Sequence, residues 1–293
     1  MVAQQLVNAL TLGSVYALFA LGFTLVFGVL GVMNMAHGAV FMAGAFAALV
    51  LVTKANLGIW VSLPLAMLVS GVLGLFIDQV VLKPLRLRRA HHLMPLIATI
   101  GVGILMTNAA QGIFGTDTSR FPFGTIPEES FQVGTIRMTT LQLAIVIISF
   151  LLMILLLLIL KRTRLGKAAR AVAENSRTAY LLGINVEGIF RLISFTAAAL
   201  GGGAGVLIGL SFNAVSPFMG LPLMPKGIAV IILGGMGDMR GAMVGGLFLG
   251  VAEVMGVAYL SSDYRDAIAF GLLFLILLIR PSGLFGRAME RKA

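Results

Sequence analysis

Long apolar runs separated by short polar or basic loops dominate this chain of 293 residues. The apolar segments cover residues 6–30, 35–53, 59–82, 93–114, 140–160, 187–211, 223–236, 241–260 and 266–280. A helix needs about 20 apolar residues to cross the hydrocarbon core of a bilayer. Backbone groups in lipid must bond to one another, so continuous runs predict helices rather than strands. The pattern predicts an all-α polytopic membrane protein. It has eight or nine transmembrane segments, depending on whether 223–236 crosses fully.

Charge is sparse, at 11% of residues, and its signs are separated along the chain. The cations gather in loops 83–92 and 161–191, at Arg240 and in the C-terminal tail. They are Lys83, Arg86, Arg88, Arg89, Lys161, Arg162, Arg164, Lys167, Arg170, Arg177, Arg191, Arg240, Arg280, Arg287, Arg291 and Lys292. The alternate loops carry the acids Asp117, Glu128, Glu129 and Asp263. Cytoplasmic loops are enriched in Lys and Arg, so the basic loops are expected inside. Nine crossings then put the N-terminus outside, and eight put it inside.

Composition excludes several classes of function. The net charge of +10 lies in loops between spans, which indicates membrane orientation rather than nucleic-acid binding. With no cysteine, the chain has neither disulfides nor a thiolate metal site. There is also no acid–base or nucleophile arrangement typical of an enzyme. We therefore expect no cofactor, no metal and no nucleic-acid partner.

Two segments of the chain are similar to each other. Residues 30–39 read LGVMNMAHGA and residues 233–242 read LGGMGDMRGA, and five of the ten positions match. About fifty residues later, each copy ends an apolar run with a cation and a proline, at Lys83-Pro84 and Arg280-Pro281. The alternative is chance similarity in a glycine-rich chain. The repeat predicts two similarly oriented halves, 1–92 and 192–293, within one domain of 1–293. Middle spans (93–160) and a polar segment (161–191) separate them.

The polar segment 166–183, GKAARAVAENSRTAYLLG, has the periodicity of a short amphipathic helix. Leu165, Ala169 and Val172 recur on one face, and Arg170, Glu174 and Arg177 on another. Gly183 is placed to end the helix. The apolar face lacks Trp and Phe, so it would anchor weakly in lipid. The two readings are a docking helix for a cytosolic protein and a helix lying on the membrane surface.

Several polar residues fall inside apolar runs, where they are costly. Glu253 lies deep in its segment, and we expect it either to pair with Lys226, to gate a pathway or to have no contact. Asp78 is within reach of Lys83 or Arg86. Three more candidates for a pathway are Asn34 and His37, which flank a break between two segments, and Asn108. Asn8, Thr11 and Ser14 share one helix face, as do Asn108 and Gln111, and they either line an aqueous path or bridge helices.

The sequence resembles the branched-chain amino acid permeases of bacterial ABC transporters, and specifically their first, shorter permease subunit. The resemblance rests on RTRLGKAARAVAEN (162–175), A-x-LLGINV (179–186), FTAAALGGGAGVL (195–207), NMAHG (34–38) and LGGMGDMRGA (233–242). It covers essentially the whole chain. It implies a coupling helix that inserts into a groove of an ATPase subunit. Carried over position by position, this role falls on Gly166, Arg170, Ala173, Glu174, Asn175 and Gly183.

The resemblance also implies partners. The chain has no G-x-x-x-x-G-K-[ST] phosphate loop, so a separate subunit must hydrolyse ATP. We expect a second permease, two cytosolic ATP-binding subunits, and a periplasmic or lipid-anchored solute-binding protein, assembled in the lipid of a bacterial inner membrane. The expected substrates are Leu, Ile and Val. The alternatives are an importer of urea or short-chain amides, an ion-coupled secondary amino acid transporter, and a channel or scaffold.

Overall fold

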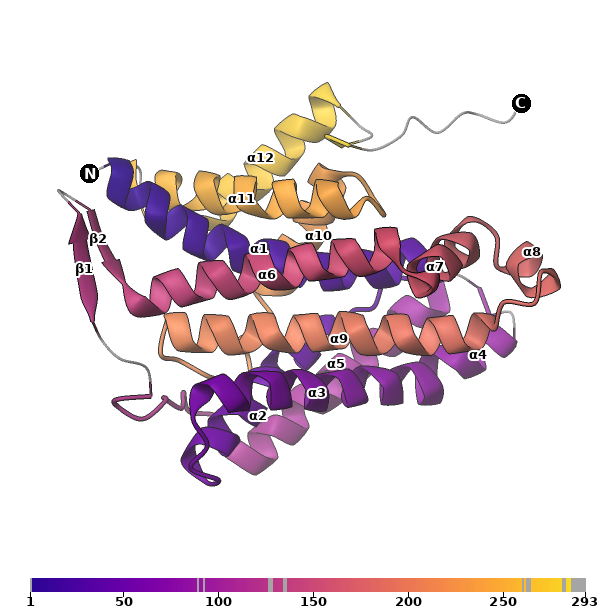
Figure 1. Ribbon diagram of the computed structural model, residues 1–293, viewed down its shortest axis with the longest axis horizontal. Helices are drawn as coiled ribbons and strands as arrows, with labels where there is room; N and C mark the ends of the chain where they lie inside the picture. Colours follow the sequence, from indigo (N-terminus) through magenta and orange to yellow (C-terminus); the bar gives the residue numbers. More distant parts are fainter. Residues whose placement is uncertain are drawn as a thin grey trace.

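The computed structural model describes residues 2–88, 90–91, 93–125, 129–133, 136–259, 261, 265–280 and 283–285. Its elements are α1 (Val2–Leu30), α2 (His37–Thr53), α3 (Ile59–Ile77), the π-helix η1 (Asp78–Leu82), α4 (Lys83–Leu87), α5 (Leu93–Phe114), β1 (Ser130–Val133), β2 (Ile136–Thr139), α6 (Thr140–Arg162), α7 (Arg164–Glu174), α8 (Ser176–Leu181), α9 (Val186–Ser211), α10 (Leu223–Gly234), α11 (Met239–Tyr259) and α12 (Arg265–Ile279). The fold is an all-α helical bundle with one small β-hairpin, as the apolar pattern predicts (Figure 1).

Six helices of the described residues are long and apolar enough to cross a membrane: α1, the continuous helix α3–η1–α4, α5, α6, α9 and α11. The helices α2 and α10 are apolar but shorter. At 1.5 Å per residue, the 12 residues of α10 extend only about 18 Å, well short of a bilayer core. The prediction of eight or nine transmembrane segments is therefore not confirmed, although the predicted boundaries agree closely with the helices.

Helix α1 lies at the centre of the bundle, packed against α9 and α11. Its most apolar window is 83% buried and that of α9 is 78% buried, whereas that of α5 is only 17% buried. Glycines allow these close approaches: a Cβ added to Gly246 would collide with the backbone of Ala17, and one added to Gly205 with the carbonyl of Phe41. Such small-residue contacts are the usual means of helix packing in lipid. The helices left at the periphery carry the exposed apolar side chains.

Two crossings of the bundle are interrupted at mid-depth. Residues 31–36, which follow α1, are not helical. Helix α2 then begins at His37, whose ring contacts Phe19 near the middle of α1. Residues 212–222 likewise precede α10, whose Gly227 also packs on Phe19. Both α2 and α10 are therefore half helices that begin near the centre of the protein. The short segment 223–236 does not cross on its own.

The two ends of the bundle carry different elements (Figure 1). The N-terminus and the β-hairpin share one end, where the Gln4 side chain donates to the Arg137 carbonyl at 2.8 Å. The basic helices α4 and α7, together with α8, share the other. This agrees with the predicted separation of basic and acidic loops for the residues that are described. The predicted loop and tail residues Arg89, Glu128, Asp263, Pro281, Arg287, Arg291 and Lys292 lie outside the described residues.

The predicted repeat and the division into 1–92, 93–160, 161–191 and 192–293 stay predictions. The first similar segment begins close to the second, since Gly28, just before it, contacts the backbone of Gly237 within the second. They then separate: Gly38 lies at mid-depth beside Met224, while Gly241 packs on Gly234 at the end of α10.

Candidate functional site

The polar segment forms two helices, α7 and α8, at the basic end of the bundle (Figure 1). The prediction of one helix over 166–183 is therefore wrong. The chain breaks at Asn175, whose backbone is extended (φ −157°) and whose side chain accepts from the Thr178 amide at 2.9 Å. Asn at this position caps α8 and so competes with a continuous helix. Gly183 has a positive φ of 83° and follows the end of α8, as predicted.

The six predicted coupling residues divide into two groups. Gly166 and Arg170 attach α7 to the bundle: Gly166 is buried against the backbone of Leu160, and the Arg170 guanidinium donates to the Leu160 carbonyl. The other four, Ala173, Glu174, Asn175 and Gly183, are exposed. The amphipathic pattern is right for Ala169 and Val172, which are buried, and wrong for Leu165, which was predicted on the same face and is 53% exposed.

Sequence reasoning missed an exposed apolar cluster at the end of α8. Tyr180, Leu181 and Leu182 are 71%, 77% and 76% exposed. Helix α8 lies at the basic end of the molecule, beyond the long helices of the bundle (Figure 1). The signal was available, since three large apolar side chains in a row directly precede Gly183 in a polar segment. An exposed apolar cluster rimmed by charge is typical of a protein contact.

An ion-pair network ties this segment to the long helices. Arg86 donates to Asp78 at 2.7 Å and to Glu187 at 3.2 Å, and its guanidinium lies 4.7 Å from the centre of the Phe190 ring. The predicted Asp78–Arg86 contact is confirmed, while Lys83 contacts Gln79 instead. Asp78 begins the π-helical turn η1, a distortion often found at functional positions. The network therefore joins η1 and α4 to the start of α9, which follows α8 in the chain.

Three buried polar side chains form a second cluster, at mid-depth in the bundle. Lys226 of α10 lies 3.0 Å from Glu253 of α11, which confirms that predicted pairing. The Tyr16 hydroxyl of α1 donates to the same carboxylate at 3.0 Å, a contact that the sequence did not suggest. Glu253 is fully buried and Lys226 is 6% exposed. A buried pair with an extra hydrogen bond is stable in lipid, where a lone charge is not.

The remaining predicted pathway residues do not form one site with this pair. Asn34 accepts from the Ala36 amide at 3.1 Å, which orders the break before α2. His37 is buried, with Nε2 lying 3.3 Å from the Phe19 carbonyl oxygen. Asn108 is exposed on α5 and donates to the Ile104 carbonyl at 2.8 Å. Asn34 and His37 thus border the mid-depth start of α2, and Asn108 lies on the outer surface of the bundle.

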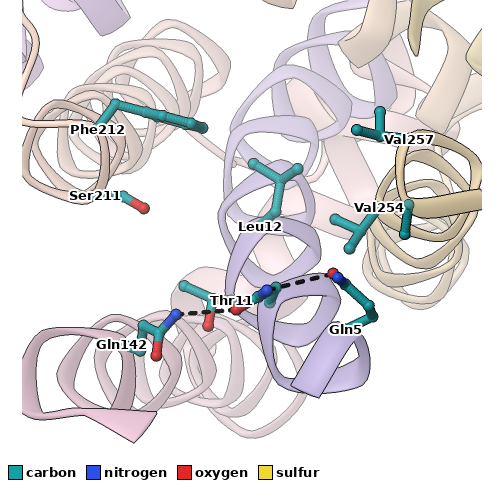
Figure 2. Close-up of a pocket in the computed structure, with 10 residues that line it drawn as sticks. Gln5, Thr11, Leu12, Gln142, Ser211, Phe212, Val254 and Val257 are labelled. Atoms are coloured by element: carbon teal, nitrogen blue, oxygen red, sulfur yellow. Dashed lines mark hydrogen bonds between the residues drawn. The ribbon is translucent and has the colours of Figure 1, made fainter. Parts of the chain in front are cut away.

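A polar cavity of about 290 Å³ lies between α1, α6, α9 and α11 (Figure 2), at the end of the bundle opposite α7 (Figure 1). Asn8 accepts there from Gln142 of α6 at 3.1 Å and donates to Gln5 at 3.4 Å. Its walls combine these amides with Thr11, Leu12, Ser211, Phe212 and valines of α11. Of the predicted polar face on α1, Asn8 and Thr11 line this cavity, while Ser14 is buried and donates to the Thr11 carbonyl.

Comparison with known proteins is consistent with this architecture. Residues 5–277 match the family described as the permease component of branched-chain amino acid transport systems. The high-affinity branched-chain amino acid transport system permease protein BraD of Pseudomonas aeruginosa is 39% identical, over 99% of this chain and 97% of its own length. The permease LivH of Escherichia coli is 36% identical over the same shares. No solved structure matches the chain.

A more distant relative is LivM of Escherichia coli, another permease protein of a high-affinity branched-chain amino acid transport system. It is 27% identical, and this chain covers 71% of its length. The similarity is thus greater to LivH than to LivM, in agreement with the resemblance to the shorter subunit. With the apolar helices, these relatives indicate a multi-pass protein of the bacterial inner membrane. The chain belongs to the family of permease components of branched-chain amino acid transport systems.

Proposed function

We propose that this chain is a permease subunit of an ABC importer that moves leucine, isoleucine and valine into the cytoplasm. The observation that carries the proposal is a near full-length match to permeases named for these amino acids, in a bundle whose basic end carries an exposed apolar cluster. The chain has no phosphate loop of its own. ATP hydrolysis is therefore assigned to partner subunits that bind at this end.

The docking surface consists of the exposed residues of α7 and α8: Ala173, Glu174, Asn175, Tyr180, Leu181, Leu182 and Gly183. Its apolar part is buried on binding an ATPase subunit, and Glu174 provides a charged contact at the rim. Closure of two ATPase subunits then moves α7 and α8, and the Arg86 network passes the movement to α3 and α9. Gly166 and Arg170 hold α7 to the end of α6, so that the segment moves as part of the bundle.

The buried Lys226–Glu253 pair argues against the ion-coupled alternative. Coupled proton or ion transport needs acids that gain and lose charge in the membrane, and Glu253 is held by Lys226 and Tyr16. We assign this cluster to positioning α10 against α1 and α11. The second permease, related to LivM by analogy with the relatives' systems, completes the membrane part of the importer together with a solute-binding protein.

The test is transport by the assembled system in proteoliposomes, with the second permease, the ATPase subunits and the binding protein. The expected result is ATP-dependent uptake of leucine. Uptake of urea or a short-chain amide in its place would reassign the substrate, and uptake driven by an ion gradient without ATPase subunits would overturn the proposal.

Two variants test the docking surface. Leu181→Ser is expected to release the ATPase subunits during purification, and Glu174→Arg to leave ATP hydrolysis uncoupled from uptake. The matched control is Phe123→Ser, which removes another exposed apolar side chain, outside α7 and α8, and should retain both ATPase binding and coupled uptake. Normal uptake in both docking variants would contradict the assigned surface.

A further inference from the structure

The two half helices begin facing each other near the centre of the protein. The backbones of Gly38, in the first turn of α2, and Gly220, just before α10, are in contact, and Met224 of α10 lies against Gly38. Both helices are long enough to carry a dipole, with 17 and 12 residues. Their N-termini therefore place two partial positive charges side by side at mid-depth, where lipid and protein screen them little.

Neither of these N-termini has the usual side-chain cap. The N-cap residues are Ala36 and Pro222, and neither makes a side-chain capping bond. The amide of Gly38 instead donates to the thioether sulfur of Met224 at 3.1 Å. Sulfur in methionine is a weak acceptor, so this buried donor is poorly satisfied. An oxygen acceptor in place of the sulfur would improve the hydrogen bonding at this point.

A polar side chain without a hydrogen-bond partner lies beside Gly38 and Met224. Thr107 of α5 is only 9% exposed and has no hydrogen-bond partner in the described part of the chain. It lines a small cavity of about 30 Å³ together with Gly38, Gly103, Gly220 and Met224. That space admits a water-sized group but not a whole amino acid. It could hold one carboxylate group.

We propose that this cavity receives the carboxylate group of the transported solute. The inference rests on the proposed import function and adds the place where the substrate is bound during passage. The Gly38 amide and the Thr107 hydroxyl donate to the carboxylate. Met224 occupies the position in the present structure and moves aside when substrate enters. Its flexible side chain makes it a suitable plug.

The surroundings of the cavity fit an aliphatic amino acid. Met35 and Leu221 provide apolar wall next to the donors, which suits a branched aliphatic side chain. Lys226 lies two residues beyond Met224, but its charge is engaged by Glu253. The attraction for the carboxylate therefore comes from the helix ends and hydroxyl rather than from a free cation, so the solute can bind and leave again. Discontinuous helices in other transporters bind carboxylates in this way.

The first experiment removes the hydroxyl. Thr107→Val keeps the shape of the side chain, and Thr107→Ser keeps the hydroxyl. In the assembled importer, we expect Thr107→Val to lower leucine uptake by about tenfold, the effect of losing one hydrogen bond to a charged group. Thr107→Ser should retain most of the uptake. ATP hydrolysis stimulated by the binding protein should persist in both variants. Equal uptake in wild type and Thr107→Val would overturn the proposal.

The second experiment uses the absence of cysteine from the chain. In the assembled importer, a cysteine in Met224→Cys should react with an anionic thiosulfonate faster than with a cationic one, and leucine should slow the reaction. Leu151→Cys, exposed on α6 toward lipid, is the control and should be unreactive. Two results would refute the carboxylate site without affecting the proposed import function. One is equal reaction rates for both reagents, and the other is that leucine fails to slow the reaction although the wild type transports leucine. Failure of wild-type transport would instead refute the proposed function.

Discussion

The charges of Glu253 and Lys226 illustrate how much a single side chain depends on its partner in the membrane. Both are buried, and they pair with each other and with Tyr16. Removing one partner leaves an uncompensated charge in a low dielectric, which costs far more than removing both.

We therefore expect Glu253→Gln to lower the stability of the protein in detergent by about 3 kcal/mol or more. The double variant Glu253→Gln with Lys226→Met should be less destabilised than Glu253→Gln alone, because no lone cation remains. Thermal unfolding of the purified protein measures both. Additive losses in the double variant would show that the two side chains do not act as a pair.

For single residues, the sequence predicted which charged side chains need a partner in the membrane better than it predicted all of the side chains that contact them. Glu253 stood out because a carboxylate in an apolar run must be neutralised, and Lys226 was the nearest cation in the neighbouring segment. Tyr16 and Thr107 gave no such signal, since hydroxyl groups are common in membrane helices and usually bond to the preceding turn. Their roles depend on which helix lies opposite, and this is set by the packing of the whole bundle.

Helix packing in this bundle relies on glycines that face other backbones. A Cβ at Gly205 would overlap the Phe41 carbonyl of α2, while a Cβ at Gly271 of α12 meets nothing within 4 Å. We expect Gly205→Ala to destabilise the protein by about 1–3 kcal/mol through overpacking. Gly271→Ala should be neutral or slightly stabilising, because alanine favours the helix. Melting temperatures of the two variants provide the comparison, and equal values would contradict the packing argument.

Helix boundaries could be predicted from the sequence, but the depth of each helix could not. The predicted run 187–211 and helix α9 differ by one residue at the start, and 93–114 is identical to α5. The run 35–53, however, reads as an ordinary span, although α2 begins at mid-depth. Hydropathy is the same for residues that cross the membrane and for residues that turn back within protein, because both avoid water.

The order of long helix, interruption, half helix and long helix occurs twice, in α1–α3 and in α9–α11. The two occurrences run in opposite directions. Along α1, Gly13 contacts Gly250 of α11 and Gly28 contacts Gly237 just before α11, so α1 and α11 are antiparallel. Helices α3 and α9 are antiparallel as well. The sequence similarity instead paired residues 30–39 with 233–242, which do not correspond in these two groups of helices. In a glycine-rich chain, matching residues indicate similar turns and close contacts more than they indicate the direction of a helix.

For the whole molecule, the orientation in the membrane follows from charge and architecture together. The end with α4, α7 and α8 carries most of the described cations, so the positive-inside rule predicts that it faces the cytoplasm, as the proposed docking of ATPase subunits requires. The N-terminus and the β-hairpin then face outward, and so does the polar cavity of Figure 2. The path of the chain thus favours the outer position for the N-terminus over the inner one.

Because the chain has no cysteine, single cysteines report this orientation directly. Phe123→Cys, at a residue 96% exposed, should react with a membrane-impermeant maleimide added to intact cells with a permeable outer membrane. Tyr180→Cys on α8 should react only after the inner membrane is opened. Phe123→Cys should retain uptake before labelling. Tyr180→Cys lies in the proposed docking surface, so it is labelled in cells that do not express the ATPase subunits and reports orientation alone. If Tyr180→Cys reacted from outside, α7 and α8 could not reach an ATPase, and the mechanism of coupling through this segment would be wrong.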